Sequence, residues 1–156
     1  MMRNALLSVH LLAVIVWIGV GFFELYLGRR FLASRGTPVE APLMRIVNTS
    51  DAVVAVATMT AFVAGIAMAL YEGDGFFHQL WLGAKQAIMI AVVLVVIGIA
   101  PTAMKLNAAT NALPPGPGPA TDEVRAYYLR LEPWYWLIRI LAVVAVLLAI
   151  WKPERI

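Results

Sequence analysis

The chain has 156 residues, of which 62% are hydrophobic and 13% are charged, and its mean hydropathy is +0.84. A composition this apolar leaves too little polar surface to cover a water-soluble domain, so it excludes that class of protein. The net charge of +3 is accounted for by basic residues facing anionic lipid, so nucleic acid is not an expected partner. The absence of cysteine excludes disulfides, thiolate metal sites and thiol redox chemistry.

Four apolar runs are long enough to cross a lipid bilayer, because one membrane-spanning helix needs roughly 20 residues. They cover about residues 5–28, 52–71, 77–100 and 133–151. None of the runs has the polar face that a helix in a water-soluble bundle presents to solvent. The sequence therefore predicts an all-α fold, in which residues 1–156 form one integral membrane domain, a bundle of four transmembrane helices.

The first run keeps ionisable side chains among its apolar ones. It follows Arg3, but it is too long for a secretory signal and lacks a small-residue cleavage site, so we expect a retained transmembrane helix. His10, Trp17 and Glu24 recur every seven residues, and a helix drifts by only about 20° over each such step. The three side chains therefore share one face of the helix.

The second run is rich in alanine and glycine and carries Met68 near its end. The residues just before it, "NTSD" at 48–51, are typical N-cap residues, so they predict that the second helix begins there. Ala61 and Gly65 are two small residues four positions apart. This spacing favours close packing against a neighbouring helix.

The third run opens with polar residues and ends at a proline. His78, Trp81 and Lys85 stand at positions i, i+3 and i+7, which places them on one helix face. The run stops at Pro101, and the segment "NALPPGPGPATDE" that follows is rich in proline and glycine. We expect a flexible loop over about 107–122 that does not pack against the helices.

The fourth run starts with Pro133 in its first turn, where the missing N–H costs nothing. Glu132, Trp136 and Arg139 stand at i, i+4 and i+7 and share a face. Three of the predicted helices thus carry a polar stripe that includes a tryptophan, and ionisable groups within membrane helices usually face the bundle interior. We therefore expect one shared interior, lined by His10, Trp17, Trp81, Lys85 and Arg139.

Charged residues between the runs predict the orientation in the membrane. The first connection carries four arginines, the second carries acidic residues only, and the third and its margins carry Lys105, Arg125 and Arg130. By the positive-inside rule the first and third connections face the cytoplasm, and both termini lie outside. We expect a multi-pass protein of a bacterial cytoplasmic (inner) membrane.

The polar side chains then divide by depth into two groups. The outer group comprises His10, Met68, Lys85 and His78, and the inner group comprises Glu24, Glu132, Arg130 and Arg139. The inner group can form a neutralising network of carboxylates and guanidinium groups. In the outer group, the metal ligands would be His10, Met68 and His78, because imidazole with a soft thioether or a second imidazole suits haem iron or copper. The alternative is that His10 only forms a hydrogen bond with a neighbouring helix.

Several short motifs resemble those of one protein family. His10 is followed by "WIG" at 17–19 and "FFELYLGRRF" at 22–31, "WLGAK" stands at 81–85, and "RLEP" at 130–133 precedes an apolar run that ends in "WKP". In order and spacing this pattern resembles the bacterial HemJ-type protoporphyrinogen oxidases over most of the chain. The same skeleton is similar to copper-resistance (CopD-like) membrane domains. The Tyr-His pair that the oxidase family carries late in its third long span is absent from "VIGIAPTAMK".

The resemblance implies a four-helix membrane protein that binds haem b and oxidises protoporphyrinogen IX to protoporphyrin IX, with quinone accepting the electrons. It implies that His10 is the axial iron ligand and that Lys85 matches the family's lysine. On this hypothesis His10, Trp17, Lys85 and Arg130 bind the cofactor. Lys85 and Arg139 act in catalysis by holding carboxylates of cofactor or substrate. Copper is the alternative cofactor.

Three other functions are consistent with the same residues. They are a b-type electron-transfer protein without enzymatic activity, a copper-handling membrane protein that uses His10, Met59 and Met68, and a structural membrane subunit. The expected partners are membrane lipid, a porphyrinogen, a quinone and further copies of the chain. An absorption spectrum of the purified protein separates the haem-binding functions from the others.

Overall fold

The computed structural model describes residues 1–73 and 80–151, and these residues form four long helices. They are α1 (Met2–Ala33), α2 (Glu40–Glu72), α3 (Leu80–Asn111) and α4 (Asp122–Trp151). Each helix is long and apolar enough to cross a membrane, and the described residues include no strand. The prediction of an all-α, four-helix membrane bundle is confirmed.

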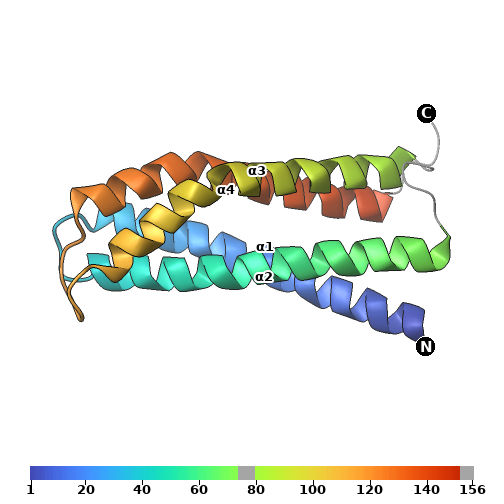
Figure 1. Ribbon diagram of the computed structural model, residues 1–156, viewed down its shortest axis with the longest axis horizontal. Coiled ribbons are helices and arrows are strands. Elements are labelled where there is room, and N and C mark those ends of the chain that lie inside the picture. Colours follow the sequence, from blue (N-terminus) through green and yellow to red (C-terminus); the bar gives the residue numbers. More distant parts are fainter. Residues whose placement is uncertain (74–79, 152–156) are drawn as a thin grey trace.

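The helices run alternately up and down the bundle (Figure 1). The start of α1 and the end of α4 lie at one end, which we call the terminal end. The connections 34–39 and 112–121 lie at the opposite end, which we call the loop end. α1 packs mainly against α2 and α3 packs mainly against α4, whereas the packing of α1 on α4 and of α2 on α3 is much less extensive. The bundle is thus made of two helical hairpins.

α2 begins well before the apolar run that predicted it. Its first residue is Glu40, so residues 48–51 lie inside the helix and do not cap it, and the predicted N-cap is wrong. The extension is helical because Ala41, Met44 and Val47 recur every three residues and are buried. This spacing gives the first turns of α2 one apolar face that packs on its neighbours.

The second hairpin also extends past its apolar runs toward the loop end. α3 continues through Pro101 to Asn111, and α4 begins at Asp122, with Pro133 in its interior rather than in its first turn. Helices of 30 to 33 residues measure about 45–50 Å. This length exceeds a hydrocarbon core of about 30 Å. Hydrophobicity therefore detected only the most apolar part of each helix.

Buried apolar side chains form two clusters along the bundle. The larger cluster lies at the loop end and joins all four helices through Phe31, Met44, Leu106 and Tyr128. The ring of Phe31 meets that of Tyr128 edge to face, with 5.6 Å between the ring centroids. The second cluster lies further toward the terminal end and comprises Trp17, Val54, Ala57, Val92, Ile138 and Ala142.

The proline- and glycine-rich connection packs against the first connection, contrary to the prediction. The backbone N–H of Gly118 donates to the carbonyl of Pro38 at 2.7 Å, and the N–H of Ala41 donates to the carbonyl of Gly118 at 3.0 Å. The guanidinium group of Arg45 donates to three carbonyls of this connection, and Leu113 is buried. The prediction that 107–122 does not pack is wrong because α2 supplies donors for the carbonyls of the loop.

Glu40 joins the two connections from a buried position at the start of α2. It is 1% exposed, and its Oε2 accepts hydrogen bonds from the N–H of Gly36 at 2.9 Å and of Ala120 at 3.2 Å. Its Oε1 pairs with the guanidinium group of Arg125 on α4. A buried carboxylate needs such partners. A polar network therefore closes the loop end beside the apolar cluster.

Candidate functional site

His10 is half-buried on α1 and faces the backbone of α2. Its Nδ1 lies 2.8 Å from the carbonyl oxygen of Ala61. Because a carbonyl only accepts hydrogen bonds, Nδ1 carries a proton, and in the neutral ring Nε2 keeps its lone pair. No hydrogen bond to Nε2 occurs within residues 1–73 and 80–151. This is the tautomer and orientation that an imidazole ligand of a metal adopts.

Gly65 provides the room for this ring. It lies one turn after Ala61, and a Cβ atom built on it would be 3.2 Å from Cε1 and 3.4 Å from Nδ1 of His10. The small residues that predicted close helix packing thus receive an imidazole rather than another backbone. The ring thus lies against two residues of α2, Ala61 and Gly65.

Lys85 of α3 belongs to the surroundings of His10. Its charge acts electrostatically on the imidazole, so the two side chains lie in the same region of the bundle. The Nζ atom of Lys85 lies 5.9 Å from the ring centroid of Trp81, one turn earlier on the same helix. Lys85, Trp81 and His10 are all half-buried. Lys85 is thus the residue of the third polar stripe whose charge reaches His10, although α1 and α3 do not pack directly against each other.

The other predicted metal ligands are placed differently. Met68 is half-buried on α2, one turn beyond Gly65, whereas Met59 is 56% exposed on the outside of the bundle. His78 lies outside the described residues. The described residues hold no group of three His, Cys, Asp or Glu side chains that could bind a metal ion.

The single oriented imidazole of His10 fits the needs of a haem iron better than those of a copper ion. A haem iron takes four of its ligands from the porphyrin and needs only an axial imidazole from the protein. A protein copper site instead needs several protein ligands close together. Met59, one of the three residues predicted to bind copper, is exposed on the outside of the bundle. Copper ligation by His10, Met59 and Met68 is therefore not what the geometry favours.

A buried ion pair lies further toward the loop end. Nη2 of Arg139 on α4 donates to Oε2 of Glu24 on α1 at 2.9 Å, and the two residues are 1% and 0% exposed. The predicted pairing of a carboxylate with a guanidinium group is confirmed for these two residues. Trp17, which stands seven residues before Glu24 on the same face of α1, is also buried, with an exposed fraction of 2%.

Asp51 is a member of this cluster that sequence reasoning missed. It interacts electrostatically with both Glu24 and Arg139. The "NTSD" motif predicts a helix cap, but the structure places it inside α2. The signal that could have found Asp51 is its spacing, because it stands four residues after Val47 and three before Val54, which are both buried.

The remaining predicted residues lie elsewhere. Arg130 is exposed nine residues before Arg139, toward the loop end, so the structure does not bring it to His10. It lines an open groove of about 460 Å³ between α3 and α4. Trp136 is half-buried beneath the guanidinium group of Arg29, whose Cζ lies 5.0 Å from its ring centroid.

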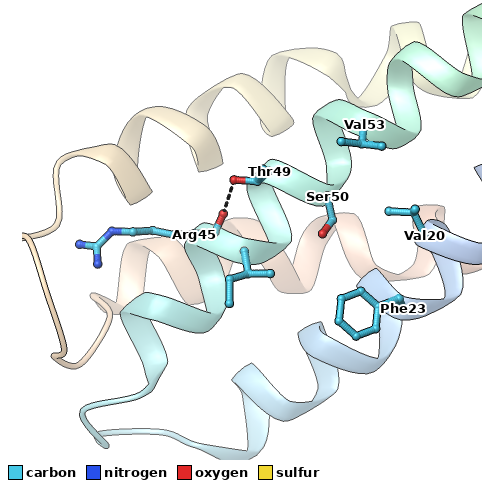
Figure 2. A pocket seen from close by; sticks show the side chains of 7 residues that line it. Val20, Phe23, Arg45, Thr49, Ser50 and Val53 are labelled. Carbon is cyan, nitrogen blue, oxygen red and sulfur yellow. Dashed lines mark hydrogen bonds between the residues drawn. The ribbon is translucent and has the colours of Figure 1, made fainter. Parts of the chain in front are cut away.

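A second open groove of about 440 Å³ runs between α1 and α2 (Figure 2). Its walls are mostly apolar, with Val20 and Phe23 on one side and Val53 on the other. The guanidinium group of Arg45 points away from the groove toward the loop 112–121. Neither groove is lined by His10, Lys85 or Arg139.

Comparison with known proteins finds no family model, no curated protein and no solved structure that matches this chain. The fold and the site define its class as a four-helix membrane protein. Its bundle holds one oriented histidine near a lysine, and a separate buried carboxylate–guanidinium cluster.

Proposed function

We propose that this protein is a haem b-binding membrane redox protein in which Nε2 of His10 is an axial ligand of the iron. The observation that carries the proposal is the 2.8 Å hydrogen bond between Nδ1 of His10 and the carbonyl of Ala61. This bond leaves Nε2 as the ring atom with a lone pair and fixes the plane of the ring. A bound haem supplies one-electron chemistry within the membrane.

Lys85 supports the proposal through its charge. An ionisable group within a membrane helix is costly and usually marks a functional site. The ammonium group acts on the region around His10 and supplies a cation there for a carboxylate of a bound porphyrin. Trp81, whose ring lies 5.9 Å from this ammonium group, adds aromatic surface beside Lys85. Trp17 is buried in the core seven residues after His10.

The proposal extends to the location of the protein, its orientation in the membrane and its redox partners. We place it in a bacterial cytoplasmic membrane with both termini outside, so that His10 lies toward the outer side. A porphyrinogen and a quinone are the proposed redox partners, because both have large apolar parts with which to enter the bundle from lipid. Oxidation of protoporphyrinogen IX is the reaction that the HemJ-type resemblance adds to this list.

The absorption spectrum of the protein purified from haem-replete cells tests the proposal. We expect a Soret band and a b-type α-band on reduction for the natural sequence, and loss of both in His10→Ala. Gly65→Ala should lower haem retention about tenfold, as changes next to a metal ligand do, because its new Cβ lies 3.2 Å from Cε1 of His10. Gly98→Ala is the matched control, since nothing lies within 4 Å of a Cβ at that position.

A colourless natural-sequence protein that elutes as a folded species would refute haem binding and favour a copper-handling or structural role. Haem bound equally by His10→Ala would refute the proposed ligand. Once haem is shown, assays of the natural protein with protoporphyrinogen IX and a quinone separate an enzyme from an electron-transfer protein. Loss of turnover in Lys85→Met with retained haem would assign Lys85 to the substrate rather than the cofactor.

A further inference from the structure

Arg139 lies directly against the backbone of α1, and Gly21 makes this approach possible. A Cβ atom at position 21 would be only 2.7 Å from Cζ and 2.8 Å from Cδ of Arg139. Trp17, Gly21 and Glu24 stand at i, i+4 and i+7 of α1, so they form one strip along the helix. The strip receives the guanidinium group, and Glu24 binds it at 2.9 Å.

The groups gathered here carry more negative than positive charge. Asp51 of α2 acts electrostatically on both members of the ion pair, so a second carboxylate lies near the guanidinium group that Glu24 binds. Within residues 1–73 and 80–151, Asp51 has no ion pair of its own. Tyr128 and Tyr135 of α4 are the other titratable groups that interact with Glu24, and phenols are neutral at physiological pH.

Three buried atoms of the cluster have no hydrogen-bond partner among the described residues. They are Nε1 of Trp17, Oε1 of Glu24 and Nε of Arg139. These are two N–H donors and one acceptor, on side chains that are at most 2% exposed. The free acceptor on Glu24 can take a proton, as a neutral carboxyl group does, whereas the two N–H donors need an acceptor such as an ordered water molecule. The cluster is therefore not a closed ion pair.

We propose that Glu24, Asp51 and Arg139 form a proton-binding centre inside the membrane bundle. The two carboxyl groups share one proton at neutral pH, and Arg139 balances the charge that is left. An uncompensated charge is costly in this environment, and two neighbouring carboxylates that hold one proton between them avoid it. Binding and release of this proton give the bundle an element of a proton relay. The inference goes beyond the proposed haem function and does not depend on it.

Infrared spectroscopy of the purified full-length protein in lipid nanodiscs tests this proposal. A protonated carboxylic acid has a C=O stretch distinct from the bands of a carboxylate, and it shifts in D₂O. We expect this stretch at neutral pH in the natural sequence, corresponding to about one protonated carboxyl group per chain. It should disappear on alkaline titration.

Two single variants make the test specific to the cluster. Glu24→Gln and Asp51→Asn should each abolish the stretch, because Arg139 balances the one carboxylate that remains. Glu40→Gln is the matched control. Glu40 is 1% exposed and its one ion pair among the described residues is with Arg125, outside the cluster, so its removal should leave the stretch unchanged. Elution volume and helical circular dichroism show whether each variant has folded.

Three results would overturn the proposal. The first is the absence of the stretch from the natural sequence at neutral pH, which no variant's folding affects. The second is its persistence in both Glu24→Gln and Asp51→Asn, which would assign it to other carboxyl groups. The third is a stretch that appears only when sodium is replaced by choline, because the cluster would then hold a sodium ion rather than a proton.

Discussion

Replacement of Gly21 by alanine tests how the buried ion pair is held. The added Cβ would lie 2.7 Å from Cζ of Arg139, and the arginine is 1% exposed, so the guanidinium group must move within a filled interior. Overpacking a core costs about 1–3 kcal/mol, and a buried charge that loses its partner costs about 3–5 kcal/mol. We expect Gly21→Ala to lower the free energy of unfolding by about 3 kcal/mol, where these ranges meet.

Gly19→Ala is the matched control for this change, because nothing lies within 4 Å of a Cβ at position 19. Alanine in a helix interior is favoured over glycine by roughly 0.5–1 kcal/mol, so this variant should be as stable as the natural sequence or slightly more stable. Unfolding by sodium dodecyl sulfate from a mild detergent, followed by circular dichroism, measures both variants. Equal stability of Gly21→Ala and Gly19→Ala would refute the close approach of Arg139 to α1.

Two further predictions concern the connections between the helices. The chain has no cysteine, so an impermeant thiol reagent applied to intact cells should label Asp74→Cys and not Arg35→Cys, and the reverse pattern would invert the topology. Arg45→Ala removes three hydrogen bonds to the loop 112–121 and should cost about 1–3 kcal/mol and expose this loop to proteases. Arg35→Ala, which removes only an exposed ion pair, should cost less than about 1 kcal/mol. Similar losses in these two alanine variants would contradict the role of Arg45.

The sequence predicted the four helices and the buried Glu24 and Arg139, because both depend on simple periodicity. It did not indicate the other buried polar residues. Long apolar runs identify membrane helices regardless of their partners. The seven-residue spacing of Trp17 and Glu24 placed them on one face, and both are buried. Arg139 was likewise predicted from a stripe on the fourth helix, and its pairing with Glu24 is confirmed.

The parts that sequence could not predict lie outside the lipid or depend on contacts between distant segments. The helices extend past their apolar runs on amphipathic faces, and these faces are too short to stand out in the sequence. The N-cap prediction for residues 48–51 is wrong for this reason, because α2 begins at Glu40. The loop 112–121 packs because Arg45, far away in the sequence, reaches its carbonyls. The 2.8 Å bond from His10 to a backbone carbonyl has no sequence signature, since every residue carries that acceptor.

Chemical rescue of a His10→Gly variant tests the haem ligand most directly. The variant removes the imidazole but leaves Ala61 and Gly65 of α2 in place, so the space beside α2 can accept a small ligand. We predict that the purified variant lacks the Soret band and that added haem together with imidazole restores the spectrum of the natural protein. Imidazole should have no effect on the natural sequence. A His10→Gly variant that binds haem as well as the natural protein without imidazole would contradict the central claim.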